Sequence, residues 1–147
     1  MIIMGYDEHY SGSETAGSVA SLPWVEKGIQ DTLAEVPAER VINAIPFYSR
    51  IWKTAADGVT STAYGMNELQ IFIANHNMEV EWNAAAEQNY AEVSEDDATY
   101  QIWIEDAESI EKKLEVMQAH GIAGVAEWCL GMESADVWTV IADYMNK

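Results

Sequence analysis

The chain has 147 residues, which suits one domain of ordinary size, and 49% of them are hydrophobic, enough for a packed core. It carries 25 acidic and 7 basic side chains, and the resulting formal charge of −18 argues against nucleic acid or an anionic membrane surface as a partner. A single cysteine excludes an intramolecular disulfide, and no apolar run reaches the ~18 residues that a membrane span needs.

Two apolar strands with a helix between them are predicted first. Residues 1–6 are apolar without alternation, which favours a strand covered on both faces of a parallel sheet. After a polar loop, a helix is predicted from Leu22 to about Glu35, with Pro23 in its first turn. A second apolar strand is predicted over 41–45. This order is the βα rhythm of a parallel α/β fold.

Residues 53–105 interrupt this rhythm. They hold one helical pattern and three β-like runs, which are predicted over 64–76, 78–82, 88–93 and 99–104. Val80 and Trp82 alternate with polar neighbours, as do the apolar residues of the last run, so we expect a sheet with one wet face. The segment 53–105 is therefore predicted to be a small α+β insertion.

The βα rhythm returns after the insertion. A helix is predicted over 107–119, with Asp106 as its N-cap, and a last helix over 137–145. Between them an apolar strand is predicted over 122–130, with Cys129 as a small buried residue. Residues 1–52 and 106–147 would form one α/β unit. Its three parallel strands would leave both sheet edges bare, which is costly for buried strands.

Polar and aromatic residues follow the end of each predicted parallel strand: M-G-Y-D at 4–7, P-F-Y-S-R at 46–50 and E-W at 127–128. In α/β barrels, binding and catalytic residues stand at that end of the strands. In order and spacing, the motifs M-G-Y-D-E-H-Y, V-I-N-A-I-P-F-Y-S-R-I-W and G-I-A-G-V-A-E-W resemble barrel strands six to eight of glycoside hydrolase family 18. These are the chitinase-like glycosidases, and the likeness is to the bacterial branch that acts on spore-cortex or cell-wall peptidoglycan. Ala44 stands where the family usually has glycine.

This resemblance implies the last three βα units of a (β/α)8 TIM barrel, with the insertion between strands seven and eight. Without residues 53–105 about 94 residues remain, roughly three eighths of a ~250-residue barrel. The family's general acid ends a D-x-x-D-x-D-x-E motif on the fourth strand, and the sequence contains no such motif. Whether this chain is an enzyme by itself is therefore left open, and we expect it to be inactive alone.

The resemblance also implies roles for individual residues in substrate-assisted hydrolysis, in which the N-acetyl carbonyl of the sugar attacks its own anomeric carbon. The catalytic candidates are Tyr6, as donor to the acetamido oxygen, and Asp7, in the hydroxyl or protonation network. Substrate-binding roles fall on a floor under the sugar ring and on donors to its oxygens: Met4, Trp128, Tyr48 and Arg50. No metal ligand and no cofactor is expected, because the three histidines share no metal-ligand spacing.

Simpler interpretations stand beside these roles. Tyr6 and Asp7 could merely end a strand, Trp128 could be a core residue, and Arg50 could pair with a carboxylate. Tryptophans at 52, 82 and 103 could line a groove or form the core of the insertion. Glu127 should point away from the face of its neighbour Trp128 in a strand, so it is not a catalytic candidate.

The implied partner is a glycan containing N-acetylglucosamine, together with the N-terminal barrel half or a second copy of the chain that covers the bare sheet edges. The alternative function is a non-catalytic carbohydrate-binding or self-assembling module. The resemblance further implies an extracellular, cell-wall or spore-associated location.

Overall fold

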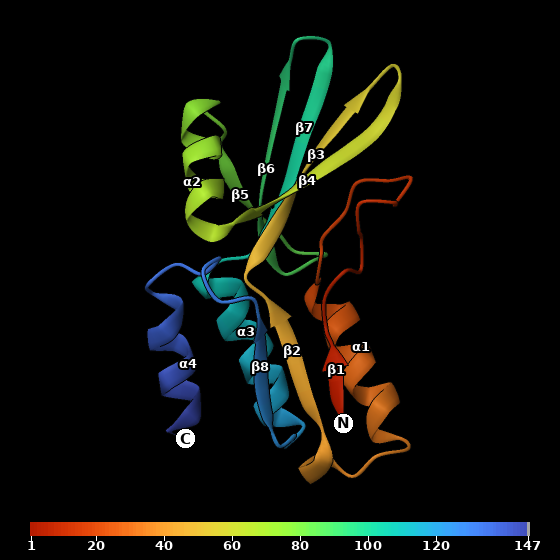
Figure 1. Ribbon diagram of the computed structural model, residues 1–147, viewed down its shortest axis with the longest axis vertical. Coiled ribbons are helices and arrows are strands. Elements are labelled where there is room, and N and C mark those ends of the chain that lie inside the picture. Colours follow the sequence, from red (N-terminus) through yellow and green to blue (C-terminus); the bar gives the residue numbers. More distant parts are fainter. Residues whose placement is uncertain (147) are drawn as a thin grey trace.

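The computed structural model describes residues 1–146, which form two sheets that follow each other along the long axis of the molecule (Figure 1). The parallel sheet has the strand order β1-β2-β8, with β1 at Ile2–Met4, β2 at Ile42–Pro46 and β8 at Gly124–Trp128. The antiparallel sheet has the order β4-β3-β7-β6-β5. Its strands, in chain order, are Tyr48–Ala55, Gly58–Gly65, Val80–Asn83, Gln88–Glu95 and Ala98–Ile104. The α/β class expected from the sequence is confirmed.

Helices cover one face of the parallel sheet. They are α1 (Leu22–Leu33), α3 (Ala107–Ala119) and α4 (Val137–Met145), and a short 3-10 turn at Ala38–Arg40 precedes β2. Val41 and Ile45 point into this layer and are fully buried in a cluster with Ile29 and Ile110. The apolar stripe of each helix therefore faces the sheet and forms this core.

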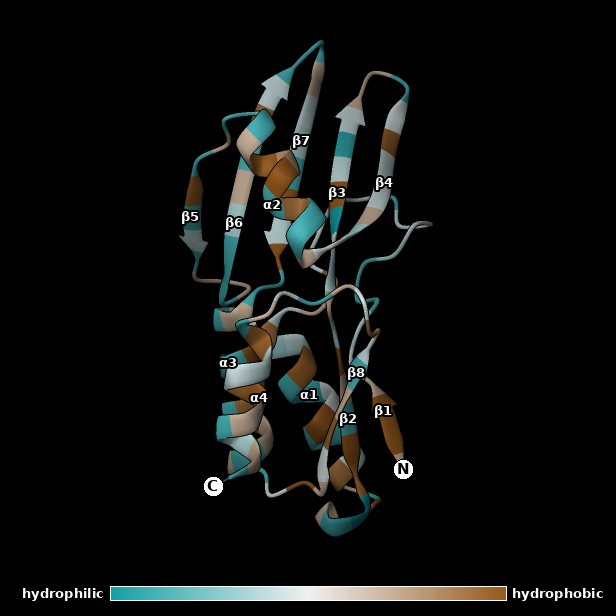
Figure 2. Cartoon of the chain, turned by 60° about the vertical axis from the view of Figure 1, so that its left-hand side comes forward, coloured by the Kyte–Doolittle hydropathy of each residue, from teal (hydrophilic) through white to brown (hydrophobic). Residues whose placement is uncertain are grey.

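The other face of the parallel sheet is bare, which corrects the prediction of an N-terminal strand covered on both faces. Ile2 is 63% exposed and Met4 69% exposed, although β1 carries the strongest hydrophobic colour in Figure 2. The reason is topological: β1 is an edge strand, and nothing within residues 1–146 packs on the face opposite the helices. β1 therefore carries more apolar surface than the described residues cover.

The antiparallel sheet has its own core beneath helix α2 (Met66–Asn75). Figure 2 shows α2 lying across one face of this sheet. Leu69 and Ile73 of α2 pack there against Ile51, Ile102 and other buried residues. The alternation expected in the strand over 99–104 is confirmed, because Ile102 and its neighbour two residues on are both buried.

Two details of the antiparallel sheet differ from the sequence prediction. The sheet begins at Tyr48 rather than after residue 52, and residues 58–65 form a strand that was not predicted. This strand lies at the edge of the sheet and half of its residues are exposed, so it lacks apolar alternation. Val80 and Trp82 are both exposed, since β5 is the opposite edge strand and faces solvent.

Helix ends explain how the chain passes between the two sheets. Asp106 caps α3 as predicted: its side chain accepts a hydrogen bond of 2.9 Å from the Ser109 amide, while the Ser109 hydroxyl accepts one of 3.0 Å from the Asp106 amide. With this reciprocal cap, α3 starts after only two residues, Glu105 and Asp106, that follow the end of β7. None of the helices in the described residues is long and apolar enough to cross a membrane.

Candidate functional site

Three aromatic side chains meet where the parallel strands end. Tyr6 follows β1, Trp128 ends β8, and Tyr48 opens β3 directly after β2. The Tyr6 and Trp128 rings are stacked, with centroids 6.2 Å apart, and Tyr6 meets Tyr48 edge-on at 6.4 Å. Parallel pairing explains this, because it brings the carboxyl ends of all three strands to one edge. Trp128 is 54% exposed, so the face of its indole is not buried in a core.

Asp7 completes this cluster. The Tyr48 hydroxyl donates a hydrogen bond to Asp7 Oδ1 at 2.5 Å, and burial together with this bond raises the pKa of Tyr48 well above its ordinary value. Burial and the nearby Asp7 charge also raise the pKa of Tyr6. Both hydroxyls therefore stay protonated and can act as donors at neutral pH. The bond joins a loop of the parallel sheet to a strand of the antiparallel one.

The backbone at Asp7 is unusual. Its φ of 65° lies in the left-handed region, which costs energy for a residue with a side chain, although aspartate tolerates it better than most. The next residue is held in place, because the Glu8 amide donates a 2.9 Å bond to the carbonyl of Val19. The conformation at Asp7 directs its carboxylate toward Tyr48, so the local strain serves the geometry of the cluster.

Arg50 and Met4 lie at the margins of the cluster. Arg50 Nη1 donates to the Ser61 hydroxyl at 3.0 Å, and its buried Nε has no partner among the described residues. No carboxylate in residues 1–146 lies within ion-pair distance of Arg50, contrary to the alternative that it is neutralised by an acid. Met4 shares the bare face of the sheet with Trp128, as the strand register requires.

The remaining tryptophans have different environments. Trp52 is fully buried and donates from Nε1 to the carbonyl of Gly17 at 2.8 Å, so it lines no open groove, but it packs against the loop after β1 and is not part of the insertion's core beneath α2. His9 packs edge-on against Trp52 with centroids 6.4 Å apart. Trp103 is half-buried and contacts Tyr90, at 5.0 Å between ring centroids. Loop residues 8–21 thus lie against the antiparallel sheet.

Other sequence candidates do not join the cluster. Glu127 is half-buried and burial raises the pKa of its carboxyl, but strand alternation turns it away from the face of Trp128. Cys129 is only half-buried and follows the end of β8, which corrects the prediction of a buried strand residue. Within residues 1–146 no group of three or more His, Cys, Asp or Glu side chains could hold a metal ion.

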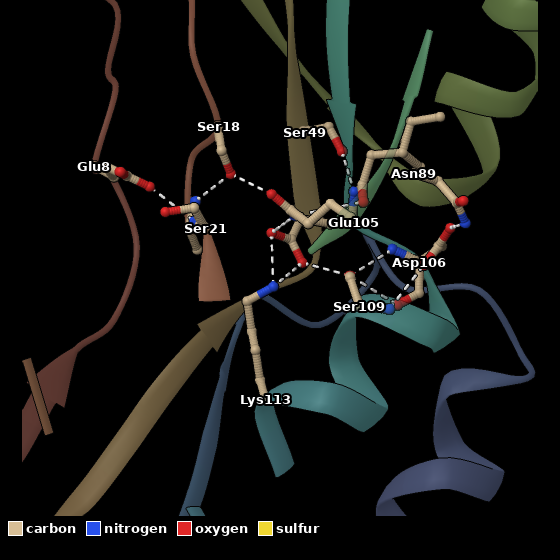
Figure 3. A network of polar contacts seen from close by, with 12 residues as sticks. Glu8, Ser18, Ser21, Ser49, Asn89, Glu105, Asp106, Ser109 and Lys113 are labelled. Atoms are coloured by element: carbon tan, nitrogen blue, oxygen red, sulfur yellow. Dashed lines mark hydrogen bonds and ion pairs between the residues drawn. The ribbon is translucent and has the colours of Figure 1, made fainter. Parts of the chain in front are cut away.

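Sequence reasoning missed a buried ion pair below the cluster (Figure 3). The Glu105 carboxylate and the Lys113 ammonium, 3.0 Å apart, are both fully buried, and Ser109 donates to the same carboxylate at 2.8 Å. The available signal was the spacing: Ser109 and Lys113 are four residues apart and share one face of α3, and Glu105 stands four residues before Ser109, just ahead of the helix.

Comparisons with known proteins agree with this geometry. The family model of the glycosyl hydrolases family 18 matches residues 1–133. The "uncharacterized glycosylase YvbX" of Bacillus subtilis is 31% identical over 140 residues, which is 95% of this chain and 40% of that protein. The cortical fragment-lytic enzyme of B. subtilis is 22% identical over 149 residues, covering 99% of this chain and 34% of that protein.

Solved structures of this fold are also similar. A chitinase from Chromobacterium violaceum superposes with a TM-score of 0.87 at 24% identity, covering 99% of this chain and 45% of that one. The Bacillus cereus spore cortex-lytic enzyme SleL superposes with a TM-score of 0.87 at 20% identity, covering 97% of this chain and 34% of that one. This chain therefore spans less than half the length of the relatives it matches. The family match over most of its residues shows that the chain belongs to the glycosyl hydrolases family 18.

Proposed function

We propose that this chain supplies barrel strands six to eight of a family 18 glycosidase, with the antiparallel sheet inserted between strands seven and eight. The support is the parallel sheet β1-β2-β8, whose two edges have no partner strand within residues 1–146, together with the exposed apolar face of β1 and the short coverage of the relatives. A closed barrel removes such edges and fills such a face. The completing strands would pair in parallel with β1 and β8.

The observation that carries the function is the cluster of Tyr6, Asp7, Tyr48 and Trp128 at the carboxyl ends of the strands. The exposed indole of Trp128 offers a flat apolar floor for a sugar ring. We propose that Tyr6, which is protonated at neutral pH, donates to the acetamido oxygen of N-acetylglucosamine. We propose Met4 as a second contact under the ring, and Arg50 as a donor to sugar oxygens.

The chemistry would be that of substrate-assisted hydrolysis with retention. The acetamido oxygen attacks the anomeric carbon while an acid protonates the departing glycosidic oxygen, and water then opens the oxazolinium ring and restores the acetamido group. Asp7, hydrogen-bonded to Tyr48, would orient the acetamido group and balance the developing positive charge. The acid itself is not encoded here, so it would come from strand four of the completed barrel.

The substrate class we propose is a glycan that contains N-acetylglucosamine, of the chitin or peptidoglycan type. Several similar proteins point the same way: chitinases, one solved with (GlcNAc)3, and enzymes named for lysis of spore cortex. A neutral glycan also needs no basic patch, which fits a chain with a charge of −18.

Calorimetric titration with (GlcNAc)3 tests the glycan site on the isolated chain. We expect weak, saturable binding with a dissociation constant of about a millimolar, lost in Trp128→Ala. Trp82→Ala is the matched control, because Trp82 is an exposed tryptophan on the distant edge strand β5, and it should bind as the unaltered chain does. Binding that survives Trp128→Ala would refute the proposed floor.

A second candidate function is a self-assembling, non-catalytic binding module. It is favoured by the exposure of Ile2 and Met4, which a second copy of the chain could cover. Light scattering at micromolar concentration separates the two proposals: a stable dimer supports self-assembly, and a compact monomer rejects it.

A further inference from the structure

A buried polar network connects the antiparallel sheet and the loop after β1 with helix α3 (Figure 3). Its centre is the Glu105 carboxylate, which lies between β7 and α3 and is closed to solvent. It accepts hydrogen bonds from Lys113 Nζ at 3.0 and 3.1 Å, from Ser109 Oγ at 2.8 Å and from Gln88 Nε2 at 2.6 Å. Because burying a charge is expensive, a fully satisfied network of this kind fixes its members in one arrangement.

One arm of the network reaches the loop that carries Asp7. The Ser18 hydroxyl donates to Gln88 Oε1 at 2.5 Å, on the side of Gln88 away from Glu105. The carbonyl of Ser18 accepts a bond of 3.2 Å from the His9 amide, and it also lies 2.9 Å from His9 Nδ1. This arm therefore ends two residues from Asp7.

The other arm reaches the strand that carries Tyr48. The Glu105 amide donates to the Ser49 hydroxyl at 2.8 Å, and Ser49 is fully buried. Ser49 stands between Tyr48 and Arg50 in β3, with its side chain on the opposite face of the sheet. The bond to Ser49 therefore holds β3 on the face opposite the site, between Tyr48 and Arg50.

We propose that Glu105 is a positioning residue for the candidate site: its buried network holds the Asp7 loop and strand β3 at the distance at which Tyr48 bonds Asp7. One arm starts from the Glu105 carboxylate and the other from the Glu105 amide, and they end beside the two partners of that bond, which lie in the loop after β1 and in β3. Supporting contacts that lock site residues from behind are what a preorganised site requires. The expected effect on glycan binding rests on the proposed function, whereas the effect on the bond between Tyr48 and Asp7 does not.

The test uses nuclear magnetic resonance on the full chain, with Tyr48→Phe to assign the Tyr48 hydroxyl proton. In the unaltered chain this proton should be shifted downfield and should exchange slowly, because it bonds Asp7. In Glu105→Gln we expect a roughly tenfold faster exchange and an upfield shift. Leu69→Ala is the control, since it destabilises the α2 core but touches no member of the network, and it should leave the signal unchanged.

The outcomes separate this proposal from the proposed function. An unchanged Tyr48 signal in folded Glu105→Gln overturns the positioning role. If Glu105→Gln does not fold, Ser18→Ala cuts one arm and decides in the same way: a faster exchange supports the role and an unchanged one overturns it. In parallel, (GlcNAc)3 should bind roughly tenfold more weakly to the altered chain. If neither the unaltered chain nor any variant binds the sugar, but the Tyr48 hydroxyl signal still changes in Glu105→Gln or Ser18→Ala, the positioning role stands and the glycan function fails.

Discussion

The replacement of Lys113 by methionine is the sharpest perturbation of the buried network. Lys113 is closed to solvent, and both of its hydrogen bonds go to the Glu105 carboxylate. Methionine fills a similar volume but removes the ammonium. The carboxylate is then left with Ser109 and Gln88 as its remaining side-chain donors, and with no countercharge.

The expected magnitude follows from this uncompensated charge. Breaking a buried ion pair by removing one partner typically costs ~3–5 kcal/mol of unfolding free energy, whereas replacing both partners is often nearly neutral. Lys113→Met should therefore cost ~3–5 kcal/mol. The double variant Glu105→Gln with Lys113→Met should cost clearly less than Lys113→Met alone, since the glutamine keeps an acceptor for Gln88 without a charge.

The loss should also depend on pH. Burial raises the pKa of the Glu105 carboxyl, and the Lys113 ammonium opposes that rise. Without Lys113, the folded chain favours the protonated carboxyl. The cost of Lys113→Met should thus be small below the ordinary carboxyl pKa of ~4.3 and should grow as the pH rises through the raised pKa of the folded state.

Equilibrium unfolding in urea measures these costs. Lys112→Met is the matched control, because the neighbouring lysine is only half-buried and lies 5.4 Å over the Trp82 ring. It should cost no more than ~1 kcal/mol. A Lys113→Met variant within 1 kcal/mol of the control, or a double variant no more stable than Lys113→Met, would refute the view that this pair is an electrostatically essential part of the fold.

Three further outcomes are expected. The pKa of Tyr48 is raised in the folded state, so its contribution to stability is present below pH ~10 and is lost above it. The melting temperature of the unaltered chain should therefore fall more steeply above pH ~10 than that of Tyr48→Phe. Parallel curves of melting temperature against pH would contradict this. Tyr48→Phe removes the hydrogen bond to Asp7 and should lower the free energy of unfolding by ~1–2 kcal/mol near pH 7. An unchanged melting temperature would count against the bond. Trp52→Ala should cost ~3–5 kcal/mol in urea unfolding because Trp52 is fully buried, whereas Trp82→Ala on an exposed edge should cost under ~1 kcal/mol, and equal costs would reverse the assignment of core and surface.

The parts of the fold that the sequence predicts are those with strong local patterns. The strand at Ile42–Pro46 is a short apolar run, and α3 carries both an apolar stripe and an N-cap at Asp106. The strand at Gly58–Gly65 was missed, because an edge strand with half of its residues exposed needs no apolar alternation. For β1 the prediction was wrong in the opposite direction: its apolar composition suits a buried strand, but one face of it is exposed in the described residues.

The site was predictable only in part, for a related reason. Tyr6 and Trp128 follow strand ends, and parallel pairing then forces those ends together. The bond between Tyr48 and Asp7 depends on how two sheets sit against each other, which no local pattern encodes. The burial of Lys113 does not follow from the pattern of α3 alone, because its acidic partner Glu105 lies before the helix begins.

Reconstitution of the barrel is the most direct test of the central claim that this chain carries the sugar-facing part of a family 18 site but not its acid. The chain would be refolded with a polypeptide of the first five βα units of a relative such as YvbX, and release of a fluorophore from a chitooligosaccharide would be measured. We expect turnover only with both partners, lowered roughly a hundredfold by Asp7→Asn and unchanged by Trp82→Ala. Turnover by this chain alone, or none from a folded stoichiometric complex, would contradict the claim.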